Sequence, residues 1–403
     1  MKNVLPRAVV LSHGPGGLGV VRSLARRGIP VTVFAYESGD LVLLSRFPQV
    51  AELIPGADDG EKERALLEKL LSFGGERPVL LMTSDRLVAF VSRHRKSLAE
   101  RFRFCIPRQD LLTTLNDKRQ ETRYLSSLGV SVPATVETLP SDVTALESAL
   151  RLPIIFKPHS FHVNNVLGRK NIVVTTRAAL EEFYAMHRSV LPDLLAQEVI
   201  PGPDTASWVC SCTFDRAYRL LDCSIKRKLR MYPPGFGVSS FAVSRSNEDL
   251  LELTRGLGAA LEYQGHANVE FRWDYRDETY KYIEINPRVG QNVEFDEATG
   301  LPTVWNTYRV AIDDVKASGL KQRDNVYFLD LGPDLISRIS DGESIAAILW
   351  SYVKTVFRRR KGQYFAFDDP VPGIVAAYRF MRRLNEALFR RLRGAYVRGD
   401  TRA

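Results

Sequence analysis

The chain has 403 residues, 45% hydrophobic and 26% charged, a composition ordinary for a globular protein of two or three domains. Its formal net charge of +9 comes from residues 354–403, which hold 13 Lys and Arg against 4 Asp and Glu. The rest of the chain is therefore neutral overall, and the basicity gives no information about the substrate of the main body. Four unevenly spaced cysteines exclude a disulfide framework, and we expect neither a signal peptide nor a membrane span. A reducing cytoplasm and packed thiols are the expectation.

The N-terminal part predicts alternating strands and helices. A strand at 7–12 leads through the glycine-rich turn Gly14–Gly19 into a helix, and further strands are predicted at 29–36, 51–54 and 78–82. This pattern is typical of a doubly wound α/β sheet.

Two features of this part are open to a functional interpretation. The Gly14–Gly19 turn resembles a dinucleotide-binding fingerprint, with Glu37 near the position of a ribose-binding acid, which leaves a nicotinamide-dependent oxidoreductase as the main alternative function. Thr83-Ser84-Asp85 follows a strand at the edge where such sheets bind ligands, but Ser84 or Asp85 could equally cap the next helix.

Three segments in the middle of the chain carry candidate binding residues. Asn116-Asp117-Lys118 begins a predicted helix. The apolar strand 152–156 ends at Lys157, whose ammonium needs an anionic partner if it is buried, and phosphate is a natural one. The loop after it, with Asn164-Asn165 and Gly168, could fold over phosphates. The strand 194–200 is broken by Pro201-Gly202-Pro203, which predicts a hinge with Asp204 just beyond it.

Residues 268–288 predict a β-hairpin around the polar turn 274–279. A turn centred near Asp277 pairs Glu270 with Glu284, and strict alternation puts Arg272, Tyr282 and Asn286 on the same face. Val269, Phe271, Ile283 and Ile285 are then expected to pack on a core. Two facing carboxylates repel each other, so the pair together with the amide of Asn286 suits a divalent cation, Mg²⁺ or Mn²⁺. Arg288 lies where it could reach a phosphate.

In this order, these segments resemble the ATP-grasp superfamily over residues 7–313, most specifically in Phe156-Lys157-Pro158 and Glu284-Ile285-Asn286-Pro287-Arg288. Within it, the likeness is to carboxylate–amine ligases, including D-aspartate ligase-like proteins. The resemblance implies an enzyme that uses ATP and Mg²⁺ or Mn²⁺ to activate a carboxylate as an acylphosphate and join it to an amine. It assigns catalytic roles to Lys157 and Arg288, nucleotide binding to Lys118, Lys157, Glu198, Val199, Ile200 and Asp204, and metal binding to Glu270, Glu284 and Asn286.

Some residues depart from the family pattern. The loop after Lys157 is poorer in glycine than is usual in the family, which keeps a non-catalytic nucleotide-binding protein as an option. Residues 222–228 resemble a segment of biotin-dependent carboxylases, but the carboxylase pattern after Arg288 is not reproduced, so carboxylation is a minor alternative. Lys226, Arg227 and Arg230 are candidates for holding an anionic substrate, or form a solvated basic strand.

The expected organisation is an α/β chain with an α+β catalytic part. It comprises a Rossmann-like pre-ATP-grasp domain at 1–105, an ATP-grasp domain at 106–313 with lobes at 106–200 and 201–313, and a basic helical region at 314–403. The amphipathic basic helices of this last region fit either peripheral contact with the inner face of a membrane or packing on the body. Expected partners are a small carboxylate and an amine, without nucleic acid, and a homodimer is compatible with the sequence.

Overall fold

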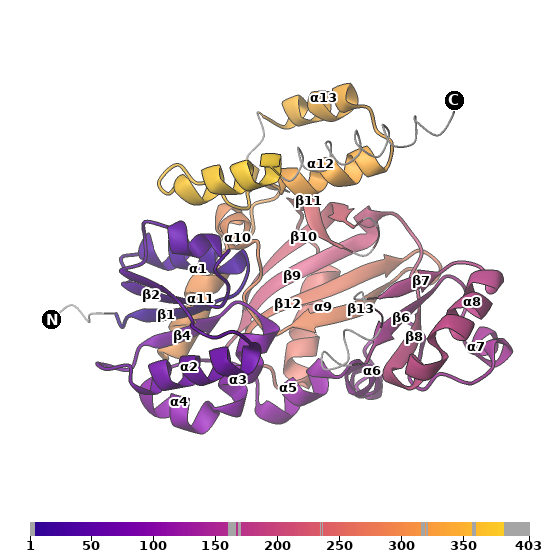
Figure 1. Cartoon of the computed structure of the whole chain (residues 1–403), viewed down its shortest axis with the longest axis horizontal. Coiled ribbons are helices and arrows are strands. Elements are labelled where there is room, and N and C mark those ends of the chain that lie inside the picture. The colour runs from indigo at the N-terminus through magenta and orange to yellow at the C-terminus, as the bar shows by residue number, and fades with distance from the viewer. Residues whose placement is uncertain are drawn as a thin grey trace, which may run out of the picture.

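The computed structural model describes residues 5–159, 167, 171–233, 235, 237–315, 319, 321–356 and 360–382, and these residues form three β-sheets (Figure 1). The α/β class is as predicted. Most of the loop expected to cover phosphates after Lys157 lies outside these residues, as does much of the basic tail.

The first sheet is parallel, with strand order β3-β2-β1-β4. Its strands are β1 (Ala8–Ser12), β2 (Val31–Ala35), β3 (Val50–Leu53) and β4 (Val79–Met82). The central strands are buried along their whole length because helices cover both faces. These helices include α1 (Gly16–Ala25), α2 (Asp59–Leu71), α3 (Asp85–Arg93) and α4 (Arg95–Arg101), and a short 3₁₀ helix, η1 (Leu41–Leu44), follows β2.

The glycine-rich turn has a packing role. A Cβ at Gly19 would lie 2.6 Å from the Cβ of Val293, and one at Gly17 would lie 1.9 Å from Ser12 Oγ. Glycine therefore lets α1 approach both β1 and a helix of the catalytic part. Glu37, the predicted ribose-binding acid, forms an ion pair with Lys62 at 3.5 Å.

The second sheet is antiparallel, with strand order β5-β8-β6-β7. It consists of β5 (Thr135–Val136), β6 (Ile154–Pro158), β7 (Ile172–Val174) and β8 (Leu194–Glu198). Its apolar face packs under α7 (Val143–Ala149) and α8 (Arg177–His187), where Phe156 stacks on Phe183 at 4.0 Å between ring centroids. The 3₁₀ helix η3 (Arg188–Asp193) leads into β8, and α5 (Gln109–Asn116) and α6 (Lys118–Ser127) precede the sheet.

The third and largest sheet has the order β13-β12-β9-β10-β11-β14-β15. Its strands are β9 (Ser207–Phe214), β10 (Leu220–Tyr232), β11 (Val238–Ser244), β12 (Gly265–Asp274), β13 (Thr279–Asn286), β14 (Tyr327–Leu329) and β15 (Arg360–Gly362), with η4 (Asp204–Ala206) before β9. One face packs apolar side chains against α9 (Glu248–Ala260), including the buried, free Cys210 and Cys212 predicted as packed thiols. The other face is polar and meets α10 (Val293–Thr299) and α11 (Thr303–Ala311).

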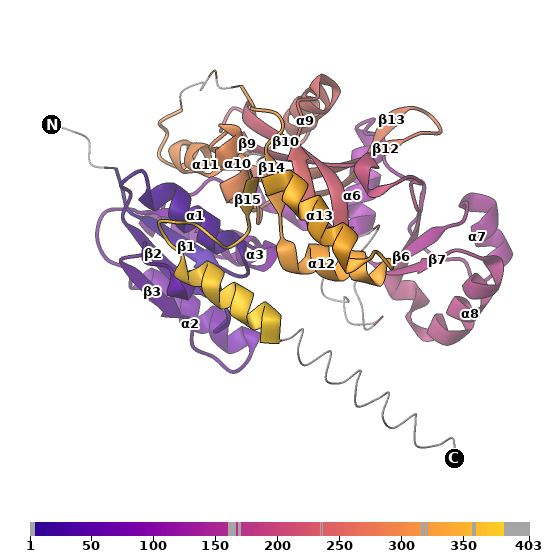
Figure 2. The same cartoon turned by 90° about the horizontal axis from the view of Figure 1, so that it is seen from above.

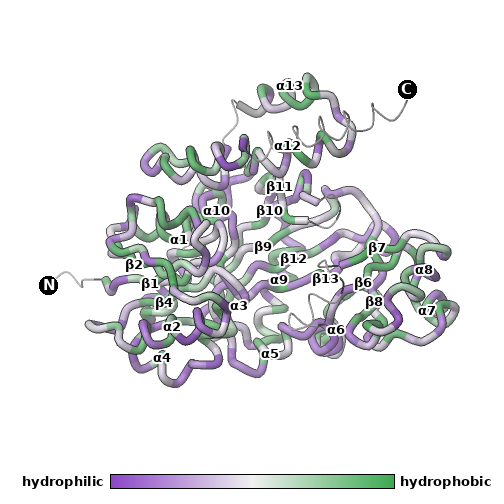
Figure 3. Tube along the Cα trace, viewed as in Figure 1, coloured by the Kyte–Doolittle hydropathy of each residue, from purple (hydrophilic) through white to green (hydrophobic). Residues whose placement is uncertain are grey.

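The described part of the C-terminal region contains helices, as predicted, but also adds β14 and β15 to the large sheet. Its helices α12 (Leu331–Ser340), α13 (Ile345–Val356) and 371–382 lie on one side of the molecule (Figure 2). Apolar and polar residues alternate along α12 and α13 (Figure 3). Among the described residues, no helix combines the length and hydropathy needed to cross a membrane.

Candidate active site

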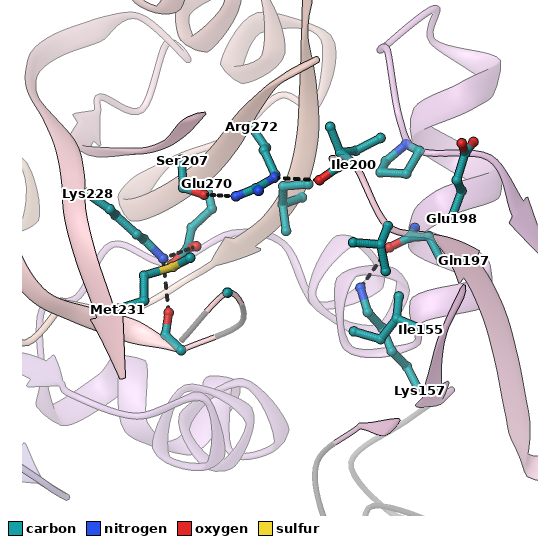
Figure 4. A pocket seen from close by; sticks show the side chains of 15 residues that line it. Ile155, Lys157, Gln197, Glu198, Ile200, Ser207, Lys228, Met231, Glu270 and Arg272 are labelled. Carbon is teal, nitrogen blue, oxygen red and sulfur yellow. Dashed lines mark hydrogen bonds and ion pairs between the residues drawn. The ribbon is translucent and has the colours of Figure 1, made fainter. Parts of the chain in front are cut away.

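A cavity of about 100 Å³ lies between the second and third sheets (Figure 4). Strands β6 and β8 supply one wall and β9, β10, β12 and β13 supply the other. The polar side chains that line it are Lys157, Gln197, Glu198, Ser207, Lys228, Glu270 and Arg272. The site is thus built between two sheets, as expected for a ligand held by two lobes.

The two predicted phosphate-binding lysines line adjacent cavities. Lys157 Nζ donates a hydrogen bond to Gln197 Oε1 at 2.7 Å, and both residues also line a second cavity that contains Lys118. Lys118 Nζ lies 2.8 Å from the buried carboxylate of Glu121. Burial disfavours its ammonium, but the carboxylates of Glu121 and Glu284 outweigh this effect and raise the pKa of Lys118. Both lysines therefore face the region between the sheets.

The predicted hinge also lines the first cavity. Its backbone is fixed by neighbours, because Val199 N–H donates to Pro153 O at 3.0 Å and Ile200 O accepts from Arg272 Nε at 2.8 Å. The carboxylate of Glu198 forms an ion pair with Arg276. Asp204, expected near a ribose, instead accepts backbone N–H groups of Met231 at 2.8 Å and Gly235 at 3.2 Å.

The predicted hairpin is confirmed, and Glu270 is paired with Glu284 across β12 and β13. A register shift follows Glu270, so the expected strict alternation is wrong at two positions. Tyr282, predicted on the carboxylate face, is buried in the core with Phe271, whereas Ile283, predicted in the core, lines the cavity. A β-bulge adds a residue to one strand, which reverses the facing of its neighbours.

Sequence reasoning missed Lys228. Its side chain is 4% exposed and its Nζ lies 2.7 Å from Glu270 Oε2. The signal was available in the sequence, because Lys228 follows Lys226 by two residues in a strand and so faces the same side. This ammonium offsets the repulsion between the two facing glutamates.

The three predicted metal ligands lie next to one another on the hairpin. Asn286 Nδ2 donates to Glu284 Oε1 at 3.1 Å, and Glu284 is the cross-strand neighbour of Glu270. No cluster of three or more His, Cys, Asp or Glu suited to a metal occurs in the part of the chain that the structure describes. Two carboxylates and an amide fit Mg²⁺ when phosphate oxygens complete its coordination, and they do not fit a cation that requires a closed protein cage.

Arg288 follows the hairpin and joins it to the first sheet. Its Nε donates to Asp85 Oδ2 at 3.1 Å, while Ser84 accepts from Leu87 N–H as the N-cap of α3. The N-cap interpretation of the segment 83–85 is confirmed, and ligand binding by this segment stays a prediction.

A buried amide holds the backbone of the Arg288 segment. Asn268 Nδ2 donates to Arg288 O at 2.8 Å, and Asn268 Oδ1 accepts from Ser211 Oγ at 2.6 Å. Ser211 Oγ accepts in turn from Lys226 Nζ at 2.9 Å. A Cβ at Gly290 would lie 2.8 Å from Asn268 Oδ1, so this close packing requires glycine.

The three basic substrate candidates of β10 are not brought together. Lys226 is buried and lies 3.3 Å from Asp296, and Arg227 donates to Thr205 O. Arg230 holds the buried carboxylate of Asp334 with two hydrogen bonds of 2.7 and 2.8 Å. A shared anion pocket does not match this geometry, because successive side chains of a strand point to opposite faces. A solvated basic strand does not match it either, because each of the three side chains already has a partner in the protein.

Comparisons with known proteins agree with this architecture. The family described as "Carbamoyl-phosphate synthase L chain, ATP binding domain" matches residues 243–315. The D-aspartate ligase of Enterococcus faecium (strain Aus0004) is 25% identical over 291 residues, which cover 66% of this chain and 68% of the relative.

Solved structures resemble most of the chain. The L-amino acid ligase from Bacillus licheniformis has a TM-score of 0.60 at 17% identity, with coverage of 80% of this chain and 78% of that one. The biotin carboxylase domain of the Hydrogenobacter thermophilus 2-oxoglutarate carboxylase, solved with MgADP, ADP and bicarbonate, has a TM-score of 0.63 at 15% identity. Its alignment covers 81% of this chain and 74% of that one. These comparisons confirm the resemblance to ATP-grasp proteins that the sequence indicated.

Proposed function

We propose that the protein is an ATP- and Mg²⁺-dependent ligase that joins a carboxylate to an amine. The observation that carries the proposal is the facing pair Glu270 and Glu284, of which Glu270 lines the cleft across from Lys157. A sheet that keeps two carboxylates side by side loses stability unless cations compensate them. The D-aspartate ligase and L-amino acid ligase relatives support the same reaction class by their names.

In the proposed reaction, a substrate carboxylate oxygen attacks the γ-phosphorus of ATP and ADP leaves. The amine nitrogen then attacks the acyl carbon of the acylphosphate, phosphate leaves, and the nitrogen loses a proton. Such chemistry requires positioning and charge neutralisation more than a protein nucleophile.

This chain offers groups for each task. Lys118 and Lys157 would neutralise phosphate oxygens, the 198–200 hinge would seat the base, and Arg288 would contact the transferred phosphoryl group. Glu270, Glu284 and Asn286 would hold Mg²⁺, which when bound supplies further neutralisation of the phosphates. Asp204 would act near the ribose with the acceptor capacity that remains after its hydrogen bonds to the backbone of Met231 and Gly235.

Two other activities have less support. The glycines of the nicotinamide hypothesis are explained by helix packing at Ser12 and Val293, and Glu37 is paired with Lys62. Carboxylation is favoured by the segment 222–228 and by the fold likeness to biotin carboxylases at 15% identity, but the carboxylase pattern after Arg288 is not reproduced.

The test is a screen of amino acids and small carboxylates, with amine acceptors, for ATP-dependent release of ADP and phosphate. We expect Glu284→Gln to lower turnover by about 100-fold or more, since it removes a charge that acts on the transferring phosphate. Glu278→Gln is the matched control, because Glu278 is exposed in the turn of the same hairpin. Unchanged turnover and unchanged Mg²⁺ and nucleotide affinities in Glu284→Gln would contradict the assignment.

We also propose that the C-terminal helices contact an anionic membrane surface. Ile345, Leu349, Trp350 and Val353 of α13 are 50–62% exposed, and Phe367 is 95% exposed. The four α13 side chains repeat at helical spacing, and residues 354–403 account for the whole net charge of +9. Apolar side chains beside basic ones are suited to the headgroup region of acidic lipids.

Vesicle co-sedimentation tests this contact with the full-length chain. We expect binding to phosphatidylserine-containing vesicles that weakens with salt and is reduced in Leu349→Ser/Trp350→Ser. Binding to uncharged vesicles of equal strength, or no binding to acidic ones, would refute the membrane interpretation and favour a protein partner for these helices.

A further inference from the structure

A third and larger cleft lies far from the two cavities that contain Lys118 and Lys157. Its volume is about 390 Å³, within the range of small-molecule sites, and it shares no lining residue with the cavity between the sheets. The C-terminal end of α11 lines it, and α11 lies among the N-terminal elements in both views while β6 lies at the opposite end (Figures 1 and 2). One wall comes from the end of α4 and the segment that follows it, and the other from residues of the catalytic part.

The lining of this cleft is strongly basic. It contains Arg77, Arg95, Arg103 and Arg216 against a single carboxylate, Asp313. Only Arg216 reaches that carboxylate, with Nε 2.8 Å from Asp313 Oδ1. The cleft thus concentrates positive charge on a part of the chain that is neutral overall.

The remaining three guanidinium groups have no acidic partner among the described residues. Arg77 donates to the carbonyl groups of Ala99 at 2.6 Å and Phe102 at 3.2 Å, and Arg95 donates to Pro107 O. Carbonyl oxygens accept hydrogen bonds without cancelling the charge. Arg103 has neither a hydrogen bond nor an ion pair from its side chain within the described ranges, although it is half-buried.

Two side chains that line the cleft have a buried donor without a partner. The Nε atoms of Arg95 and Arg103 are both buried and lack a hydrogen-bond partner within the described part of the chain. Leaving such donors unsatisfied costs stability, and native structures usually satisfy them. Burial also lowers the pKa of Arg95, the sign of a cation taken from water without a compensating charge.

We propose that this cleft binds a small phosphorylated molecule. Guanidinium groups hold phosphate oxygens with paired hydrogen bonds, and four of them line this cleft beside a single carboxylate. The volume exceeds the needs of one phosphate group, and the partly exposed Ala99 and Phe104 offer an apolar surface for the rest of the molecule. Because Arg95 and Arg103 lie on one wall and Arg216 on the other, the ligand links the first domain to the catalytic part and stabilises their arrangement.

The probe is inorganic pyrophosphate, titrated into the full-length protein in magnesium-free buffer and followed by calorimetry and thermal unfolding. Arg95→Gln and Arg103→Gln remove one charge each while keeping a polar side chain. Arg101→Gln is the matched control, since Arg101 is exposed on α4 but does not line the cleft. Circular dichroism establishes that each variant is folded.

We expect wild type and Arg101→Gln to bind pyrophosphate and to unfold at a higher temperature with it. Arg95→Gln and Arg103→Gln should each bind at least about tenfold more weakly, the loss expected for one charge-assisted contact. Absence of binding to wild type, or equal binding by all four proteins, would overturn the proposal. The second result would place the pyrophosphate elsewhere, for example at Lys118 and Lys157.

Discussion

Replacing Asn268 by Ala removes a contact that holds the backbone at Arg288 and leaves the Arg288 side chain itself unchanged. The amide donates to Arg288 O at 2.8 Å and accepts from Ser211 Oγ at 2.6 Å, and its residue is only 7% exposed. Alanine leaves a buried carbonyl and a buried hydroxyl each short of one partner. Each buried polar group left without a partner costs about 1–3 kcal/mol. Because Ser211 keeps its hydrogen bond to Lys226, we expect the free energy of unfolding to fall by about 2–4 kcal/mol in total.

The same substitution should lower kcat more than it raises KM. The segment that carries Arg288 loses its anchor, and a small misplacement of a group that acts on the transferred phosphate costs on the order of 100-fold in rate. Urea unfolding and initial-rate assays on the same preparations give both quantities. Asn247→Ala is the control, because Asn247 caps α9 at 2.9 Å and its loss should cost about 1 kcal/mol without changing kcat. A kcat for Asn268→Ala equal to that of the control would refute the positioning role.

Three further predictions concern stability. Burial raises the pKa of Asp222 to about 7, so the protonated form stabilises the fold fully below pH 4. As pH rises to 7, up to about 4 kcal/mol of the free energy of unfolding is lost. Asp222→Asn should abolish this dependence on pH, measured by urea unfolding between pH 4 and 8. Arg22→Leu should cost about 3–5 kcal/mol, because it leaves the carboxylate of Asp369 buried without its cation at 2.9 Å, and limited proteolysis should then cut residues 363–370 faster. Gly19→Ala should cost about 1–3 kcal/mol in thermal unfolding, since its Cβ would overlap Val293.

Each of these has an outcome that would contradict it. A pH slope in Asp222→Asn equal to that of wild type would mean that other groups titrate. Unchanged proteolysis in Arg22→Leu would show that the 363–370 segment is held by other contacts. Gly74→Ala is the control for Gly19→Ala, because a Cβ there has nothing within 4 Å, and equal losses would exclude packing as the cause.

The sequence predicts the local elements of the site well, because each rests on a short-range pattern. The hairpin and the pairing of Glu270 with Glu284 follow from alternation and a polar turn, and the structure has both. Lys157 at the end of an apolar strand likewise lies in the cleft.

What the sequence could not supply depends on contacts between distant segments. The register shift that buries Tyr282 is set by how β12 and β13 fit their neighbours, including a hydrogen bond of 2.5 Å from Tyr282 to Glu121 on α6. The sequence predicts Arg230 as a ligand for an anion, but in the structure its guanidinium binds the carboxylate of Asp334, 104 residues away. The addition of β14 and β15 to the large sheet rests on strands of three residues, too short to carry a periodic signal.

The contact between Arg22 and Asp369 has a consequence for synthesis of the chain. Arg22 is fully buried in α1, yet its acidic partner and the carbonyl of Tyr364 are encoded more than 340 residues later. A first domain emerging from the ribosome therefore holds a guanidinium group whose partners have not yet been translated. The final packing of α1 therefore requires nearly the whole polypeptide. This helix is synthesised early but can complete its contacts only late.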